Sequence, residues 1–476
     1  MLDNIKEEIV SYGGIKQYLY AQQEKILLRF LTCGNVDDGK STLIGRLLHD
    51  THQIYEDQLS VLYKEIRSID DKNKKLDLAS LLDGLQLERA QGITIDVAYR
   101  FFFTKKRKFI IADTPGHLEY TKNMVTGAST SELAVLLIDA RKGIQHQTKR
   151  HWFISALLGI KHIVIAINKM DLINYNKKIF QDISKEFLEF AKKLYFKTNI
   201  QFIPISALDG DNIATTSINM KWYKGPTLLE VLDNINIKNV GDWKQQKLRF
   251  PIQYVIRNNS GFRGYSGTIA SGSIHTGQLI NTFPSNNTAQ IQRIIVSSSD
   301  VTHAYAGEAI TVTLNEDLDI SRGDMLVDIN SVSPARDVLI NIIWMHTEAL
   351  KEGQYFNVKI ATKLLKAQVL KIECKINVDT FQYQKTNSIS LNEIGLIKLS
   401  FDELLILDKY SDSPMTGSMI FIDLLTNETV GAGMIDETIK YNPIYNKYNR
   451  NYSKFELELH SFIRLHFPHW GIKDLS

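Results

Sequence analysis

One short run near the N-terminus constrains the fold of this chain more than any other feature: Gly34-Asn35-Val36-Asp37-Asp38-Gly39-Lys40-Ser41, followed by Thr42. Its glycines let the backbone curve closely around phosphate groups, and its N–H groups and the start of the next helix face the negative charge. In this pattern the lysine reaches the β- and γ-phosphates, and the serine hydroxyl binds Mg²⁺. We therefore predict a nucleotide-binding loop between a buried strand and a helix.

Apolar runs alternate with helix-like segments through the first half of the chain. We predict strands over residues 27–31, 108–112, 133–139, 162–168 and 200–204, and helices over 41–49, 120–127, 147–158 and 179–193. Buried strands that alternate with helices are typical of a mostly parallel, doubly wound sheet. The predicted fold class of this half is therefore an α/β phosphate-loop domain.

A second motif, Asp113-Thr114-Pro115-Gly116-His117, follows the strand that ends at Ala112. An aspartate in this place can hold Mg²⁺ through a water molecule, and Gly116 can present its N–H group to a γ-phosphate. His117 then stands where an attacking water must be. An isolated histidine is usually structural, but its place in this motif favours a catalytic role.

A third motif, Asn168-Lys169-Met170-Asp171, follows the next strand, and Ser206-Ala207-Leu208 follows the last one. The Asp171 carboxylate only accepts hydrogen bonds and can take both donors of guanine, N1–H and the exocyclic amine, whereas adenine presents no such pair. Asn168 would brace the loop, Lys169 would lie over the ring, and the backbone of residues 206–208 would donate to guanine O6. The predicted base is guanine.

Thr94 lies in the segment Gln91-Gly92-Ile93-Thr94-Ile95-Asp96, between the first two motifs. Its hydroxyl is the candidate second ligand of Mg²⁺, made only when a γ-phosphate is present, and such a contact orders a segment until hydrolysis. A plain edge strand is the alternative. The predicted catalytic set is His117, Lys40, Gly116 and Thr94, and the predicted Mg²⁺ set is Ser41, Thr94 and, through water, Asp113.

Beyond residue 247 the hydrophobic period drops to two, and short strand-like runs are separated by Gly, Ser and Asn turns, which is typical of small β-barrels. We predict a helical extension at 1–23, the α/β domain at 24–235, a linker at 236–247, β-barrels at 248–335 and 336–450, and an amphipathic helix or tail at 451–476. The tail has a capping box, Ser453 with Glu456. Its apolar face could dock on the chain's own barrel or on another subunit.

Composition narrows the class of protein. The net charge of +3 is too small to indicate nucleic-acid binding by itself, and the one dense basic run, Lys105 to Lys108, is predicted to be a solvated hairpin turn, with a phosphate or RNA patch as the alternative. The two cysteines, Cys33 and Cys374, fit a reducing cytosol rather than a disulfide framework. We find neither a signal peptide nor a membrane-spanning run, so we predict a cytoplasmic protein with no membrane or nucleic-acid partner.

These motifs, in this order and ahead of two barrels, resemble the elongation-factor class of GTPases. Longer runs, among them GNVDDGKSTLIGRLLHDT, FIIADTPGHLEYTKNMVTGAS and FRGYSGTIASG, are similar to the large, GTP-binding subunits of bacterial two-subunit sulfate adenylyltransferases. Elongation factors carry His or Ser where this chain has Asp38, which favours the sulfate family. The absence of a second phosphate loop before Ser476 argues against the form fused to an adenylyl-sulfate kinase.

This resemblance implies an activity, cofactors and a partner. A GTPase of this family uses GTP and Mg²⁺, and His117 would orient the hydrolytic water between Val36 and Ile93. It would form a heterodimer or higher heteromer with the small catalytic subunit, and would couple GTP hydrolysis to the synthesis of adenylyl sulfate and pyrophosphate from ATP and sulfate. The alternatives are a GTPase that delivers aminoacyl-tRNA and a structural GTPase with slow turnover. Acidic runs on the barrels, such as residues 315–317, count against the tRNA carrier.

Overall fold

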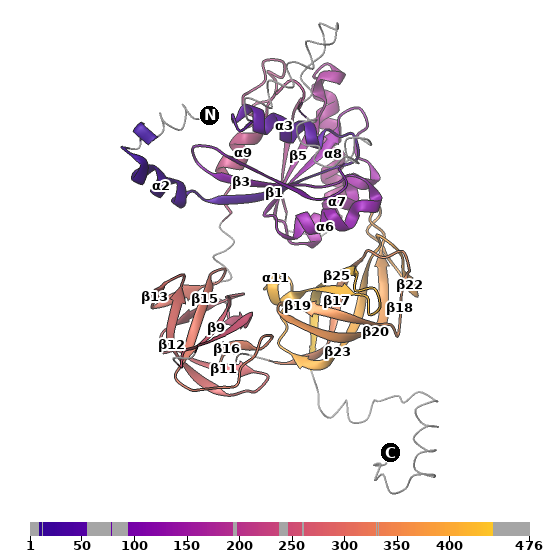
Figure 1. Ribbon diagram of the computed structural model, residues 1–476. Helices are drawn as coiled ribbons and strands as arrows, with labels where there is room; N and C mark the ends of the chain where they lie inside the picture. Colours follow the sequence, from indigo (N-terminus) through magenta and orange to yellow (C-terminus); the bar gives the residue numbers. More distant parts are fainter. Residues whose placement is uncertain are drawn as a thin grey trace.

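The computed structural model describes residues 9–11, 13–54, 78, 94–193, 198–237, 246–258, 261–329, 331 and 333–440. The chain forms one α/β domain and two antiparallel β domains, which lie below it in Figure 1. The predicted order of an α/β domain followed by two β-barrel domains is confirmed. In the described part of the chain, no helix is both long enough and apolar enough to cross a membrane.

The α/β domain is built on a six-stranded sheet with the order β2-β3-β1-β4-β5-β6. Only the edge strand β2 runs antiparallel to its neighbour. The central strand β4 is buried along its whole length, as expected for a strand that is covered on both faces. The strands are β1 (Leu27–Cys33), β2 (Ala98–Phe103), β3 (Lys108–Asp113), β4 (Leu133–Asp139), β5 (His162–Asn168) and β6 (Asn199–Pro204).

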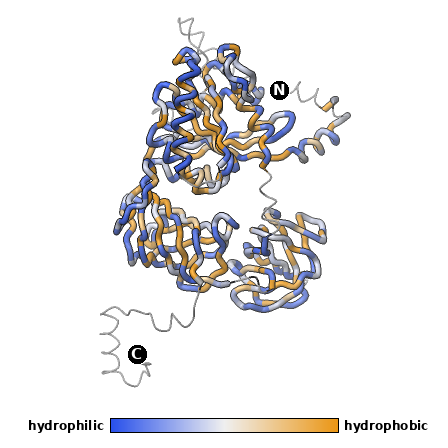
Figure 2. The backbone as a smooth tube through the Cα atoms, turned by 180° about the vertical axis from the view of Figure 1, so that it is seen from behind, coloured by the Kyte–Doolittle hydropathy of each residue, from blue (hydrophilic) through white to orange (hydrophobic). Residues whose placement is uncertain are grey.

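Helices pack on this sheet and leave its apolar strands in the interior, where Figure 2 shows a hydrophobic centre. They are α3 (Lys40–Asp50), α6 (Thr121–Ser129), α7 (His146–Leu157), α8 (Lys177–Ala191) and α9 (Leu228–Asn234), and α2 (Ile15–Glu24) precedes β1. Helix α9 begins at a capping box in which Thr227 and Glu230 bond to each other's backbone N–H groups.

The first barrel domain follows Gln246 and consists of short antiparallel strands in the order β7-β16-β11-β12-β15-β9-β8, with β13 paired to β12. Strands β10 and β14 form a separate pair. The bounds are β7 (Arg249–Pro251), β8 (Tyr254–Arg257), β9 (Arg263–Thr268), β10 (Ser273–His275), β11 (Leu279–Phe283), β12 (Thr288–Val296), β13 (Ser299–Val301), β14 (His303–Tyr305), β15 (Ala309–Leu314) and β16 (Met325–Asp328).

The second barrel domain is closed, because β19 pairs with both β24 and β20 at the ends of a six-strand path. Its strands are β17 (Ala335–Trp344), β18 (Leu350–Lys351), β19 (Tyr355–Ile360), β20 (Lys363–Ile376), β21 (Tyr383–Gln384), β22 (Ser388–Ile389), β23 (Ile394–Leu405), β24 (Ser418–Ile422) and β25 (Thr429–Lys440). A one-turn helix, α11 (Pro414–Gly417), interrupts the strands.

Four expectations need correction or fall outside the described residues. The basic run is a turn, but Arg107 is buried and not solvated, because its guanidinium donates to the carbonyls of Leu232 at 2.8 Å and Ile235 at 2.9 Å. The second barrel was predicted from strand-like runs separated by turns, but Pro414 starts the short helix α11 within it. The amphipathic tail at 451–476 and most of the predicted linker lie outside the described residues.

Candidate nucleotide-binding site

The phosphate loop is the turn between β1 and α3. Gly39 caps α3 in a left-handed conformation, φ 93°, which a glycine adopts without strain. The helix starts at Lys40, so its N-terminal N–H groups face the loop. The Lys40 Nζ atom lies inside the curve of the loop and donates to the carbonyls of Asn35 at 2.8 Å and Gly34 at 3.3 Å. Burial lowers the pKa of Lys40, and the nearby carboxylates of Asp38 and Asp113 oppose that shift.

Asp38 is the buried acid of this loop. Its Oδ2 atom accepts from the Asn35 N–H group at 2.7 Å, which holds the loop closed on itself. Burial raises the pKa of Asp38, while the hydrogen bond from Asn35 and the charge of Lys40 act against that rise. The neighbouring Asp37 is exposed and has a left-handed backbone, φ 65°. The two acids therefore differ in role, since Asp38 stabilises the loop and Asp37 faces solvent.

The segment after β3 lies directly against the phosphate loop. A Cβ atom on Gly116 would be 2.5 Å from Lys40 Nζ and 2.8 Å from the Gly34 carbonyl oxygen, so only glycine permits this approach. Asp113 is buried at the end of β3, where Thr32 Oγ1 donates to it at 3.4 Å. His117 is exposed, and its Nδ1 atom accepts from the Glu119 N–H group at 3.4 Å.

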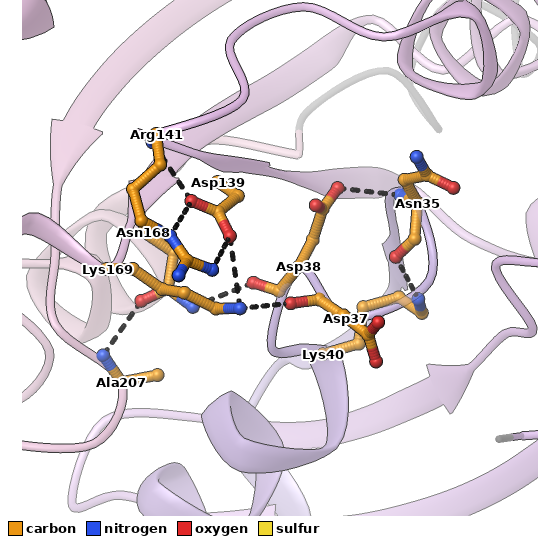
Figure 3. Close-up of polar contacts among 9 residues, drawn as sticks. All are labelled: Asn35, Asp37, Asp38, Lys40, Asp139, Arg141, Asn168, Lys169 and Ala207. Atoms are coloured by element: carbon orange, nitrogen blue, oxygen red, sulfur yellow. Dashed lines mark hydrogen bonds and ion pairs between the residues drawn. The ribbon is translucent and has the colours of Figure 1, made fainter. Parts of the chain in front are cut away.

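The loop after β5 is tied to the phosphate loop through Asn168 (Figure 3). Asn168 Nδ2 donates to the Asp38 carbonyl at 2.8 Å, and Asn168 Oδ1 accepts from the Ala207 N–H group at 2.9 Å. One buried amide thus joins the phosphate loop to the loop after β6. Lys169 reaches across to the Asp37 carbonyl and lies along the same side of the site.

Asp171, in the loop after β5, and Ser206, in the loop after β6, contact each other. Ser206 Oγ donates to Asp171 Oδ1 at 2.7 Å, which leaves the other carboxylate oxygen, Oδ2, as a further acceptor. Arg46 of α3 donates to the carbonyls of Ala207, at 3.2 Å, and Leu208, so the peptide planes of this loop are fixed. Met170 is fully buried and packs in the core.

Three predicted residues lie at the edges of this arrangement. Ser41 is the second residue of α3 and is half-buried, and Thr42 follows it. Thr94 is half-buried too, and the carbonyl of its neighbour Ile95 accepts from Asn123 Nδ2 at 2.7 Å. The roles assigned to these hydroxyls from the sequence stay predictions.

Sequence reasoning missed two residues that organise the site. Asp139, at the end of β4, pairs with Lys169 at 3.1 Å and Arg141 at 2.7 Å. Burial acts to raise the pKa of Asp139, but the hydrogen bonds from Arg141 and Lys169 outweigh it and lower the pKa to about 2. A signal existed, because Asp139 directly follows a fully apolar run that ends at the same sheet edge.

His151 of α7 is the second residue of the site that the sequence did not reveal. Its Nδ1 atom accepts from the Gly34 N–H group at 3.1 Å, and burial lowers its pKa to about 3, so the ring is neutral and carries its proton on Nε2. Nothing in the sequence pairs position 151 with position 34, because the contact joins the interior face of a helix to a strand end.

The residues present fit a guanine nucleotide with Mg²⁺. The loop offers a buried cation and helix N–H groups to phosphates, and Asp171 offers an acceptor to a base. Among the described residues, no group of three or more His, Cys, Asp or Glu side chains could hold a metal. Mg²⁺ in nucleotide sites takes hard oxygen ligands, and the Ser41 hydroxyl at the start of α3 would be one of them.

Two family models and several relatives match this chain. The family model "Elongation factor Tu GTP binding domain" matches residues 25–238, and "GTP-eEF1A C-terminal domain-like" matches residues 337–436. The protein "Sulfate adenylyltransferase subunit 1" of Yersinia enterocolitica is 52% identical over 99% of this chain and 98% of its own length. The protein of the same name from Salmonella arizonae is 54% identical over 99% and 98%.

A solved structure of sup35 complexed with GDP aligns with 87% of this chain and 95% of its own, at 20% identity and a TM-score of 0.40. That similarity is too low to support an argument about this chain.

Proposed function

We propose a function from one premise: the chain belongs to the sulfate adenylyltransferase subunit 1 family and carries a GTP-binding domain of the elongation-factor type. In this proposal the chain hydrolyses GTP with Mg²⁺ and acts as the regulatory subunit of a two-subunit sulfate adenylyltransferase. The partner, a small catalytic subunit, makes adenylyl sulfate and pyrophosphate from ATP and sulfate. The complex takes part in sulfate assimilation in the cytoplasm.

The hydrolytic step is assigned to residues around the phosphate loop. Lys40 balances the charge of the β- and γ-phosphates. Ser41, Thr94 and a water on Asp113 would hold Mg²⁺, which would supply further positive charge to the phosphates. Gly116 lies against Lys40 and presents its N–H group to the γ-phosphate. His117 orients the attacking water. It is exposed, so it can turn toward the phosphate without breaking buried contacts.

Coupling requires that the partner binds the GTP and GDP forms of this chain differently, since a ligand that binds both equally shifts no equilibrium. To raise the ratio of adenylyl sulfate to its substrates tenfold above equilibrium, GTP hydrolysis must supply about 1.4 kcal/mol. The segments around Thr94 and His117 contact the nucleotide in only one of the two forms in this proposal. They are therefore the parts of the chain that report the nucleotide state to the partner.

One observation carries this proposal over a tRNA-delivering GTPase: identity of 52–54% to proteins named sulfate adenylyltransferase subunit 1 extends over nearly the whole chain, barrels included. The barrel surface adds support. On the first barrel, Arg257 and Arg263 are paired with Asp317 and Asp319, which leaves no unbalanced basic face at that place.

The test is GTP turnover by the purified chain, alone and with the small subunit, ATP and sulfate. We expect a slow basal rate that rises when all three are added, and we expect His117→Ala to retain GTP affinity and lose the increase. A rate that ignores the partner and its substrates would exclude the regulatory role. Unchanged hydrolysis by His117→Ala would remove that residue from the mechanism.

A further inference from the structure

His117 lies between two backbone carbonyls that distant side chains hold in place. The Gly116 carbonyl accepts from Gln147 Nε2 of α7 at 3.4 Å. The Leu118 carbonyl accepts from Asn392 Nδ2 at 3.0 Å. Asn392 belongs to the second barrel, 274 positions away in the sequence. The backbone on both sides of the histidine is thus fixed from outside its own segment, on one side by another domain.

Asn392 is built into its loop with little freedom. Its side chain is 5% exposed, and its backbone has the left-handed φ of 62°, which asparagine tolerates better than most residues. Its N–H group donates to the Trp344 carbonyl at 2.8 Å, and the Trp344 N–H group donates to the Glu393 carbonyl at 3.0 Å. Because its loop is held in this way, the Asn392 side chain fixes the position of the Leu118 carbonyl.

The second barrel is itself anchored against α7, next to the same segment. Phe381 packs on Phe153 with ring centroids 5.6 Å apart, and on Trp152 and Phe190 at 5.9 Å and 4.7 Å. Beside it, Asp379 pairs with His146 at 2.7 Å. The barrel therefore meets the α/β domain through an apolar contact, and Asn392 adds a directed hydrogen bond to that contact.

We propose that Asn392 is a positioning residue for GTP hydrolysis: its amide fixes the Leu118 carbonyl and thereby the orientation of the His117 segment. The proposal rests on the proposed function and deepens it, because it makes the second barrel part of the hydrolytic machinery. Movement of the barrel away from the α/β domain breaks this bond and releases the segment. The barrel can thus set the hydrolysis rate without touching the nucleotide.

The Leu118 carbonyl also has two local donors, the Thr121 N–H group and Thr121 Oγ1, the latter at 2.6 Å. Loss of Asn392 therefore leaves no unpaired carbonyl, and the segment keeps its fold while losing its link to the barrel. This makes the position suitable for substitution. Asn392→Asp preserves the shape and replaces the donor with an acceptor, and Asn392→Gly removes the amide but keeps the left-handed backbone.

A matched control removes another hydrogen bond between the same two domains. Tyr410 Oη donates to the Leu158 carbonyl at 3.0 Å, at the C-terminal end of α7. Tyr410→Phe deletes this bond and leaves the His117 segment untouched. This variant measures how much a weaker contact between the two domains changes kcat when the His117 segment is intact.

The experiment measures kcat for GTP hydrolysis, GTP affinity and thermal stability for each variant of the full chain. We expect both Asn392 variants to lower kcat by about tenfold, the equivalent of one hydrogen bond of about 1.4 kcal/mol. GTP affinity should be unchanged, and Tyr410→Phe should keep the wild-type kcat. In a His117→Ala background, Asn392→Asp should cause no further loss, because it acts through that histidine.

Three results would overturn the inference. One is a wild-type kcat in both Asn392 variants. Another is an equal loss in Tyr410→Phe, which would assign the effect to the domain contact as a whole. The third is a full further loss in the His117→Ala background. In each case GTP hydrolysis by the wild-type chain would still support the proposed function. A wild-type chain that does not hydrolyse GTP would contradict both the proposed function and the inference about Asn392.

Discussion

Replacing Asn168 by alanine should separate the phosphate loop from the loop after β6, to which we assign base recognition. The Asn168 side chain is 2% exposed and joins the Asp38 carbonyl, at 2.8 Å, to the Ala207 N–H group, at 2.9 Å. Truncation leaves both backbone groups without this partner. A buried polar group that loses its partner costs about 1–3 kcal/mol, so the two groups together cost about 2–6 kcal/mol.

Most of this cost should appear in nucleotide binding. In the free variant the two loops can separate and their polar groups can meet water, whereas bound GTP forces the loops together again. Because about 1.4 kcal/mol is a factor of ten in Kd, the Kd for GTP should rise by at least about thirtyfold. Titration of the purified variant with a fluorescent GTP analogue measures this directly.

Thr282→Val provides the control for a general loss of stability. Thr282 is buried in the first barrel, and its hydroxyl donates to the Asn287 carbonyl and accepts from the Asn287 N–H group, both at 3.2 Å. This variant should lose hydrogen bonds of the same kind without any change in the Kd for GTP. A normal Kd for Asn168→Ala, or equal shifts in both variants, would refute the assigned bracing role of Asn168.

The other predictions concern charges in the site. Lys40→Ala should abolish nucleotide binding in the same titration, and a retained Kd would contradict the assigned phosphate site. Asp171→Asn should shift the preference from GTP to XTP, because the new amide can donate to the xanthine oxygen; competition between the two nucleotides measures this, and a retained GTP preference would exclude Asp171 as the base acceptor. The pKa of Asp139 is lowered from 3.8 to about 2, so its contribution to folding is present above pH 4 and is lost as the pH falls toward 2. The stability difference between wild type and Asp139→Asn should therefore shrink over that window in denaturant titrations, and a constant difference would refute the assigned ion pairs.

The α/β domain was predictable from sequence because its signals are local. The predicted strands over 133–139 and 162–168 have the bounds of β4 and β5, since each holds a continuous apolar run that ends at a polar residue. The phosphate loop, the Asp113 segment and the Asn168 segment could be placed because each directly follows such a strand. The same placement brings Gly116 against the phosphate loop, where no larger residue fits.

What could not be predicted depends on contacts between residues far apart in the chain. The sequence shows Arg107 as one member of a basic run. It is buried because α9 and its C-cap residue supply two carbonyls 125 and 128 positions away. Asn392 reads as a turn asparagine, and only the fold brings it to Leu118. Helix α9 is short and was not predicted separately, because its seven residues carry too few turns for a clear period.

The most direct test of the account follows adenylyl sulfate itself. The chain and the small subunit are mixed with ATP and sulfate, with GTP or with a non-hydrolysable analogue, and adenylyl sulfate is measured as GTP is consumed. We predict product beyond the equilibrium of the uncoupled reaction with GTP only, and no such excess with the analogue or with His117→Ala. Product that stops at the same uncoupled level with GTP and with the analogue would contradict the central claim that this GTPase drives the synthesis.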